Sequence, residues 1–439
     1  MRYLFCWAAL LGAALFSCSL SCSKKNAPGK VVTPPPSDSS LVNFGHLDQL
    51  YTPLIFPDGM PAAGVYVYSN YPGYVNTDAT GEGYTCVDDV SRAALVYLRS
   101  GRYATDTAIR SKLDNLIVFL LEMQSGNGYF YNFLLPSGQI NTSGNTSINV
   151  AEWWSWRAFM TLTEAAPAIK SLNPPLYTRM TASIAALVAR LKTDLVPLPH
   201  TTTSVSGITV PQWLPSGSAT DQSAVLILGL INYCQANSDP VMTDLIKSLA
   251  DGVVLMEQND STNFPYGAFL SNQNSWHAYG NLQAYALMQA GNFLGAPVYN
   301  QAGLTEVNHF YPWLLQNGFQ SSFSVGESGG VFVMLSDTAY PQIAYGIEPM
   351  VFAAAEAYRE TGQAAYADMA GHLAAWFLGA NAANTDMYSL STGVCFDGIS
   401  SPGSVNQNSG AESTIEALLT LQRVEAYPAI DAALKKYGK

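Results

Sequence analysis

The stretch GYTCVDDVSRAALVYL, residues 83–98, contains the pattern that decides the fold. Its acidic start, Asp88-Asp89, runs directly into an amphipathic segment that predicts a helix over 87–100. Similar segments recur along the chain with Gly, Pro or Asn between them. Together they predict about twelve helices, over 87–100, 107–123, 147–165, 175–193, 219–236, 240–257, 277–293, 298–316, 342–360, 364–379, 411–424 and 428–437.

Twelve helices in sequential pairs predict an all-α (α/α)6 toroid, in which an inner ring of helices is surrounded by an outer ring. Strands are few, and residues 65–68, 128–134 and 329–335 are the best candidates for short β-hairpin strands in loops. In such a ring every second helix runs the same way, so all inner helices start on one face. Closure of the ring also places the first and last helix pairs side by side.

The starts of the odd-numbered helices carry polar or aromatic residues, whereas the even-numbered helices start without them. We interpret the six odd-numbered starts as one functional face. The alternative is that odd-numbered helices are better capped, which explains Asp and Asn but leaves Trp and Tyr unexplained. The candidate residues of this face are Asp88, Asp89, Glu152, Trp153, Trp154, Asp221, Trp276, His277, Tyr279, Tyr345 and Glu412.

The predicted seam makes Asp88 and Asp89 neighbours of Glu412, although they lie near opposite ends of the domain. Cleavage of a glycosidic bond needs two such groups, one that protonates the leaving oxygen and one that activates water or attacks directly. A structural interpretation exists as well, because Ser409-x-x-Glu412 matches a capping box. Asp88 or Asp89 also suits a helix N-terminus, and Arg92 can pair with either. Since the acids share a face with aromatic residues, we favour the catalytic interpretation.

The other residues of the face are expected to bind substrate. Glu152 would bind hydroxyls or act as a second acid, with a capping carboxylate as the alternative, and Asp221 suits a cap or a binding residue equally. Trp153, Trp154, Trp276, His277, Tyr279 and Tyr345 would stack on or bond to sugar rings. For His277 the alternative is a core histidine. Two further acids lie nearby: Asp397 would hydrogen-bond the loop before residue 411 or mark a turn, and Glu348 is expected to be structural.

Composition excludes some classes of partner. The formal net charge is −12 and only 12% of residues are charged, which argues against nucleic acid, whose phosphates need clustered Lys and Arg. The 25 Tyr and 8 Trp suit sugar faces, or any other polar uncharged ligand. The five His are dispersed and no Cys-x-x-Cys spacing occurs, so we expect no metal or other cofactor.

The N-terminus predicts export. Arg2 is followed by an apolar run of signal-peptide length, and Leu15-Phe16-Ser17-Cys18 has the order that bacterial lipoprotein processing requires. We therefore assign 1–17 to a lipoprotein signal peptide, 18–40 to a Pro/Ser-rich tether and 41–439 to the catalytic domain. Cys22 is a second candidate for lipidation, and simple secretion is the alternative. The expectation is an exported bacterial protein, lipid-anchored to the outer or cytoplasmic membrane in the periplasm or at the cell surface.

Residues 83–98, together with 376–421, resemble the six-hairpin glycosidase superfamily of (α/α)6 toroids. An Asp pair near the start of the domain and a Glu near its end is similar to the inverting family-nine cellulases. This resemblance implies that Asp88 and Asp89 share the base role and that Glu412 is the acid. The Asp-Ala-Gly-Asp stretch of those cellulases is absent, and Gly-Ala-Glu-Ser departs from their acid motif. The two motifs look closer to a toroid attached to some bacterial glycosyltransferases.

The expected function is therefore hydrolysis of glycosidic bonds in an oligo- or polysaccharide, with inversion implied by the resemblance. A polysaccharide lyase or sugar epimerase on the same fold is the alternative enzyme. These usually need a Tyr, His or Arg as base, and a lyase needs cations for a uronate carboxylate; the chain has only 20 Lys and Arg, and none begins an odd-numbered helix. A non-catalytic surface lipoprotein that binds glycans is the third interpretation.

Overall fold

The computed structural model describes residues 40–438 except 259–260. The predicted signal peptide, both candidate lipidation sites (Cys18 and Cys22) and all of the predicted tether but Ser40 lie outside the described residues. The described part of the chain belongs to one compact unit. Among its helices, none has both the length and the apolar composition needed to cross a bilayer.

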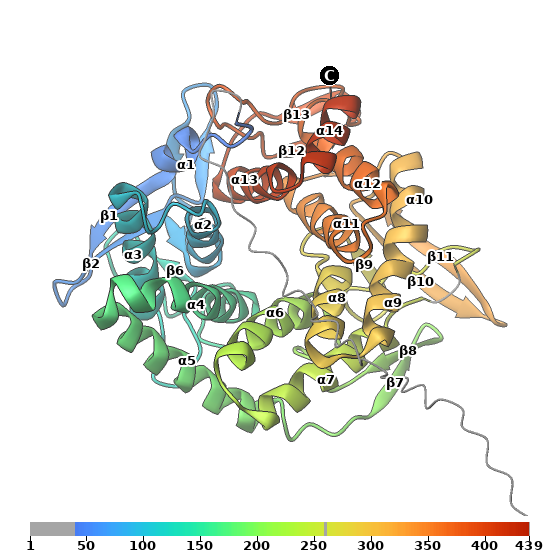
Figure 1. The fold of residues 1–439 in the computed structure, drawn as a ribbon, viewed down its shortest axis with the longest axis horizontal. Helices are drawn as coiled ribbons and strands as arrows, with labels where there is room; N and C mark the ends of the chain where they lie inside the picture. The colour runs from blue at the N-terminus through green and yellow to red at the C-terminus, as the bar shows by residue number, and fades with distance from the viewer. Residues whose placement is uncertain (1–39, 259–260, 439) are drawn as a thin grey trace, which may run out of the picture. The chain divides into compact units, whose positions relative to one another are not determined.

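The helices of this unit form two concentric rings, as predicted (Figure 1). The inner ring consists of α2 (Val87–Arg99), α4 (Trp153–Leu172), α6 (Thr220–Ala236), α8 (Gln283–Leu294), α11 (Glu348–Thr361) and α13 (Ala411–Glu425). Each inner helix packs on the next, and α13 packs on α2, which closes the ring. Inner helices are buried around most of their circumference; in α6 every residue from Thr220 to Ile227 is buried.

Each inner helix pairs with the outer helix that follows it in the chain. The outer ring consists of α3 (Thr107–Glu122), α5 (Pro174–Asp194), α7 (Pro240–Leu255), α9 (Pro297–Thr305), α12 (Ala364–Ala374) and α14 (Pro428–Tyr437). After α9 the helix continues through a π-helical turn, Glu306–Phe310, into α10 (Tyr311–Gln316). A short helix, α1 (Gly45–Leu50), precedes the first pair and packs on α13.

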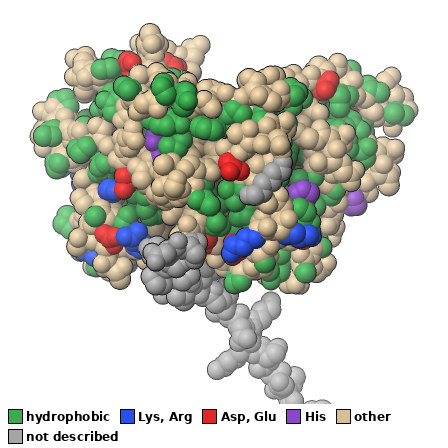
Figure 2. Space-filling model, turned by 90° about the horizontal axis from the view of Figure 1, so that it is seen from above, with side chains coloured by type: hydrophobic (Ala, Val, Ile, Leu, Met, Phe, Trp, Pro, Cys, Tyr) green, Lys and Arg blue, Asp and Glu red, His purple; other side chains and the backbone are tan. Residues whose placement is uncertain are grey.

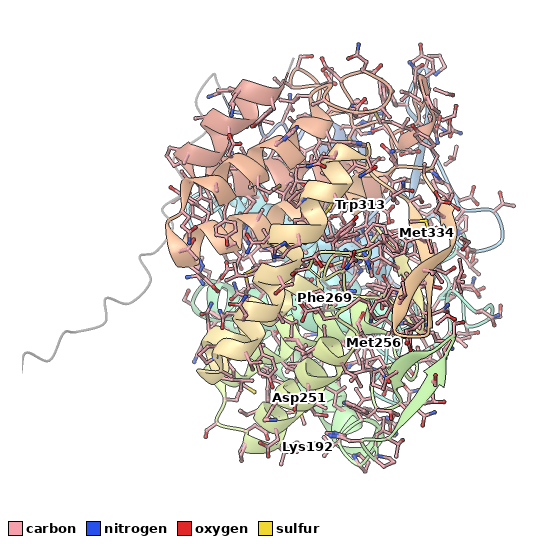
Figure 3. The ribbon with its side chains drawn as sticks, turned by 90° about the vertical axis from the view of Figure 1, so that its right-hand side faces the viewer. Lys192, Asp251, Met256, Phe269, Trp313 and Met334 are labelled. Atoms are coloured by element: carbon pink, nitrogen blue, oxygen red, sulfur yellow. The ribbon has the colours of Figure 1, made fainter. Side chains whose placement is uncertain are left out.

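The strands are short and pair only in antiparallel fashion. The two-stranded pairs are β1 (Tyr51–Ile55) with β2 (Pro61–Val65), β3 (Tyr68–Asn70) with β4 (Val75–Thr77), β5 (Thr85–Cys86) with β6 (Phe133–Leu134), β7 (Thr202–Val205) with β8 (Ile208–Pro211), and β12 (Gly398–Ser401) with β13 (Ser404–Asn406). The three-stranded sheet has the order β11 (Val331–Thr338), β10 (Ser322–Ser328), β9 (Ser275–His277). Met334 lies on the outer strand of this sheet (Figure 3).

Three predicted inner helices start later than expected, at Trp153, Gln283 and Glu348. The residues before them are held by other backbone pairing: 275–277 forms β9, and Gln342 pairs with Ile399. Glu348 is consequently the first residue of α11, rather than two turns into it. Among the predicted strands, 329–335 lies largely in β11, whereas only the last two residues of 128–134 form a strand and 65–68 divides between β2 and β3.

Helix capping runs opposite to the alternative considered from the sequence. Side chains of Asp106, Asn173 and Asp239 cap the outer helices α3, α5 and α7. Of the inner helices, α2 alone has a side-chain cap, from the thiol of Cys86, while α4, α6, α8, α11 and α13 have none. The idea that inner helices are simply better capped is therefore wrong, and their polar starts need another explanation.

Candidate active site

A cavity of about 430 Å³ opens where the first and last inner helices meet, and we call it the carboxylate pocket. The predicted residues that line it are Asp88, Asp89, Trp153, Trp154, Tyr279, Tyr345 and Glu412. They come from α2, α4, α13 and the segments that precede α8 and α11. Closure of the ring thus brings together residues that are far apart in the sequence, as the toroid predicts.

Arg92, one turn into α2, connects the carboxylates of the pocket. Its Nη2 atom lies 2.9 Å from Asp88 Oδ2, 2.7 Å from Asp89 Oδ1 and 3.5 Å from Glu412 Oε2. Its other terminal nitrogen lies 2.5 Å from Glu416, one turn further along α13. The guanidinium group is 3% exposed, so these ion pairs form largely out of contact with solvent. The structural interpretation of the acids had Arg92 pair with either aspartate, and it pairs with both.

The two aspartates differ in environment. Asp88 is 22% exposed, and a second buried arginine, Arg157, places its Nε atom 2.6 Å from Asp88 Oδ1, although not in hydrogen-bond alignment. Asp89 is 9% exposed and accepts a hydrogen bond from the Cys86 thiol at 3.3 Å. Burial raises the pKa of Asp89, while Arg92 opposes the shift. Asp88 is therefore the aspartate that reaches the open part of the pocket.

Glu412 lies in the first turn of α13 but does not cap it. The N-cap residue is Gly410, and the hydroxyl oxygen of Ser409 accepts a hydrogen bond from the Cys395 N–H instead of a helix amide. The predicted capping box is therefore not formed. The Glu412 side chain is 44% exposed, yet protein atoms surround the carboxyl group closely enough that desolvation raises its pKa to about 7. Arg92 counters this shift, whereas Asp89, Glu416 and Asp88 add to it.

Asp397, rather than a capping side chain, holds the first turn of α13 in place. Its Oδ1 atom accepts hydrogen bonds from the Gly410 N–H and the Ser413 hydroxyl, both at 2.8 Å. These contacts flank Glu412 and fix the first turn of α13. The prediction that Asp397 hydrogen-bonds the loop before residue 411 is confirmed.

Aromatic rings form one wall of the pocket. Trp153 lies with its ring 5.4 Å from the Arg157 guanidinium, and the indole N–H of Trp154 donates to the Phe130 carbonyl at 2.7 Å. Tyr345 lies beneath both arginines, 4.8 Å from Arg157 and 5.0 Å from Arg92. Trp154 and Tyr345 are buried, so Trp153 is the ring of these three that is open to an uncharged sugar.

Gly280 allows these aromatic residues to approach one another. Its φ of +66° suits glycine, and a Cβ atom at this position would lie 2.5 Å from the Tyr345 hydroxyl and 2.8 Å from Trp153. The chain can therefore pass directly from Tyr279, at the rim, to the inner helix α8.

Tyr279 is held in place by His277. The two rings stack at 3.7 Å, His277 Nε2 lies 3.0 Å from Asp221 Oδ2, and His277 Nδ1 lies 2.9 Å from the Tyr279 carbonyl. Both ring nitrogens of His277 are therefore engaged by oxygen atoms of the protein. Tyr279 itself is 44% exposed and lines the pocket, whereas Asp221 and His277 support it from behind.

Besides Asp221 and His277, which lie behind Tyr279, two more predicted residues do not line the carboxylate pocket, Glu152 and Trp276. Trp276 is 1% exposed and stacks on Phe323 at 4.8 Å, within an aromatic cluster that includes Trp313 (Figure 3). The expectation that Trp276 binds substrate is wrong, because β9 directs it into the core. Glu152 accepts hydrogen bonds from Gln222 and Ser216 outside the pocket and makes no side-chain cap.

Sequence reasoning missed Arg157 and Tyr68. Arg157 lies four residues after Trp153 on the same helical face, a spacing that could have revealed it. Tyr68 is half-exposed, and nothing in the sequence of its short strand, β3, indicates that it lines the pocket. Although no cation begins an inner helix, both Arg92 and Arg157 reach the pocket from one turn further along.

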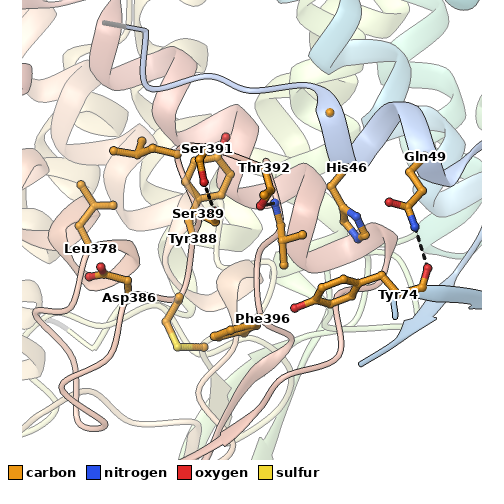
Figure 4. A pocket seen from close by; sticks show the side chains of 14 residues that line it. His46, Gln49, Tyr74, Leu378, Asp386, Tyr388, Ser389, Ser391, Thr392 and Phe396 are labelled. Carbon is orange, nitrogen blue, oxygen red and sulfur yellow. Dashed lines mark hydrogen bonds between the residues drawn. The ribbon is translucent and has the colours of Figure 1, made fainter. Parts of the chain in front are cut away.

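A larger cavity, about 880 Å³, lies elsewhere, between α1 and the segment 378–396 (Figure 4). His46, Tyr74 and Phe396 line it, but its single carboxylate is Asp386. Because it lacks paired acids, we place the candidate active site in the smaller cavity. The described residues contain no group of three or more His, Cys, Asp or Glu suited to a metal ion.

No protein family model matches the chain, and no curated protein is significantly similar in sequence. Solved structures are similar in fold. A cellobiose 2-epimerase from Bacillus thermoamylovorans B4167 aligns with a TM-score of 0.56 and 10% identity, covering 82% of this chain and 91% of the epimerase. The chain has the six-hairpin (α/α)6 toroid fold.

Two hydrolases share this toroid. A family 76 glycoside hydrolase from a bovine Bacteroides thetaiotaomicron strain aligns with a TM-score of 0.54 and 13% identity, covering 85% of this chain and 74% of the hydrolase. The family 9 endoglucanase J30 aligns with a TM-score of 0.50 and 13% identity, covering 86% of this chain and 78% of the endoglucanase. The chain spans about half, 52%, of a GH127 β-arabinofuranosidase, with a TM-score of 0.46. These identities show the fold alone, so the activity has to be argued from the pocket.

Proposed function

We propose that the protein is a glycoside hydrolase that cleaves an uncharged oligo- or polysaccharide in the carboxylate pocket. The observation that carries this proposal is Glu412, whose side chain enters a cavity that also holds Asp88 and Asp89 and whose pKa is raised to about 7. A carboxylic acid that keeps its proton near neutrality is suited to protonating a leaving oxygen. Paired with an ionised carboxylate, it supplies both groups that glycosidic cleavage needs.

In this mechanism Glu412 is the general acid, and Asp88 and Asp89 share the base role. Asp88 is the more exposed of the two and would contact the water, while Arg92 forms an ion pair with each. Because distances of 2.7 and 3.5 Å meet at one nitrogen, an oxygen of Asp89 and one of Glu412 lie no more than about 6 Å apart. That separation is shorter than the roughly 6.5–9.5 Å of inverting enzymes and nearer to the spacing of retaining ones. The contact of Glu412 with Arg92 is the longest that this guanidinium makes, so it is the one that a substrate would open.

The pocket also supports a ranking of the alternative enzymes. A lyase would need cations free to bind a uronate, but Arg92 and Arg157 are already engaged by carboxylates. Burial raises the pKa of Tyr345, against the opposing effect of the arginines, which makes it a poor base. Both ring nitrogens of His277 are engaged as well, which argues against the proton abstraction that an epimerase requires. Hydrolysis therefore ranks first.

We also propose export and lipid anchoring at Cys18 or Cys22, which the leader sequence supports.

Assay of a panel of neutral oligosaccharides is expected to reveal cleavage by the wild-type protein that Asp88→Asn and Asp89→Asn reduce by roughly 10²-fold or more. Asparagine preserves shape but cannot accept the proton from water. The readouts are the release of reducing ends and proton NMR of the anomer formed first. The resemblance to inverting enzymes predicts an inverted product; a retained product, which the short carboxylate separation favours, would contradict direct displacement but leave hydrolysis standing. Binding without turnover by any panel member would instead favour a glycan-binding protein.

The pH dependence provides a separate prediction. Glu412 acts only when protonated, so kcat/KM should fall as pH rises through about 7. On the acid side, kcat/KM should fall as protonation removes the carboxylate base, at a pH above the ordinary range for Asp89 because its pKa is raised. The profile of kcat/KM against pH checks both limbs. A descending limb near pH 4.5, the range of an unperturbed glutamate, would refute the assignment of Glu412.

A further inference from the structure

Glu412 borders two cavities. The second cavity, of about 310 Å³, is lined by Glu412 but not by Arg92, and we call it the Asp397 pocket. Tyr68, Ile343, Asp397, Ser400 and Asn406 contribute to its lining. Val67, Tyr68 and Glu412 line both cavities, so the two are contiguous along the Glu412 side chain. A general acid at the junction of two cavities can reach an oxygen that joins groups held on either side.

We propose that the Asp397 pocket binds the leaving group, a neutral sugar unit of the same saccharide whose other unit occupies the carboxylate pocket. This inference rests on the proposed function. Water attacks the anomeric carbon held near Asp88 and Asp89, and its proton passes to their carboxylates. The bond from that carbon to the bridging oxygen breaks, its electron pair stays on the oxygen, and the oxygen takes the proton of Glu412.

The chemistry of the lining determines which leaving group fits. None of the residues lining the Asp397 pocket is Lys or Arg, whereas Asp397 and Glu412 are acidic, so an acidic sugar would be disfavoured. One carboxylate oxygen of Asp397 is engaged by Gly410 and Ser413. Tyr68, 50% exposed, offers an aromatic surface, and Ser400 and Asn406 offer hydroxyl and amide groups. These groups suit an uncharged, hydroxyl-rich ring.

The walls of the Asp397 pocket are built from paired backbone. Ser400 and Asn406 lie on the hairpin of β12 and β13, and Gln342 exchanges two backbone hydrogen bonds with Ile399, at 2.9 and 2.8 Å. The hairpin is thereby joined to the segment that carries Ile343. This arrangement fixes the pocket relative to Glu412 without any contribution from a ligand.

The test compares two leaving groups on one sugar. Ser400→Trp should fill the Asp397 pocket and lower kcat/KM on the cleaved oligosaccharide by about tenfold or more, while changing kcat/KM on the matching glycosyl fluoride by less than about twofold. Fluoride needs neither space for a sugar nor a proton. Ser401→Trp is the matched control, because Ser401 is exposed on the same hairpin and does not line the pocket. Asn406→Trp fills the pocket from the facing strand if Ser400→Trp does not fold.

An equal loss on both substrates, or no loss on either, would overturn the leaving-group assignment while hydrolysis stands. A wild-type protein that cleaves neither the oligosaccharide panel nor the glycosyl fluorides would overturn the proposed function and, with it, this inference. Selective loss on the oligosaccharide, absent from Ser401→Trp, supports it.

Discussion

Glu412→Gln is expected to lower kcat/KM on an oligosaccharide by about 10²–10⁴-fold while leaving cleavage of the corresponding glycosyl fluoride nearly unchanged. Glutamine fills the same space but carries no acidic proton, and a fluoride leaving group needs none. The measurement is the ratio of kcat/KM values on the two substrates. Glu425→Gln, at the other end of α13, is the matched control and should leave the ratio at the wild-type value.

The same variant separates the catalytic from the structural interpretation of Glu412. Because Glu412 makes no helix cap, its replacement should cost little of the free energy of unfolding. A loss of about 1–2 kcal/mol with full turnover, as expected for a lost cap, would contradict the catalytic assignment. Equal losses on the oligosaccharide and the fluoride would contradict proton donation specifically.

Arg92→Met is expected to lower the free energy of unfolding by about 3–5 kcal/mol, because it leaves several carboxylates together without their counter-ion. The side chain is 3% exposed and contacts Asp88, Asp89 and Glu416 at 2.5–2.9 Å. Urea unfolding at neutral pH measures the loss. The loss should shrink at low pH, since carboxylates that have taken up protons no longer need the arginine.

A surface ion pair provides the control for Arg92. Arg102 pairs with Asp106 one turn away, and its side chain is 36% exposed. Arg102→Met should therefore cost less than about 1 kcal/mol. If Arg92→Met lowers the free energy of unfolding by no more than Arg102→Met does, the pocket carboxylates do not need the arginine for stability.

The sequence predicted the architecture because the helical period and the Gly and Pro breaks survive in every helix pair. It failed at the helix starts 147, 277 and 342, where no side-chain cap marks the start. Before two of these helices, β9 and the pairing of Gln342 with Ile399 take up residues that the helical pattern had included. The gathering of Asp88, Asp89 and Glu412 followed from ring closure alone. Trp276 could not be assigned correctly, because an aromatic residue looks the same in sequence whether it enters a pocket or the core.

The site forms where the two ends of the domain meet, so it is complete only after α13 has packed against α2. A chain that ends before α13 lacks Glu412 and Glu416, which are two of the four carboxylates that Arg92 contacts. In the proposed mechanism, a chain that still lacks α13 therefore has no general acid. Activity would therefore indicate that the whole domain is present and that its first and last helix pairs have packed together.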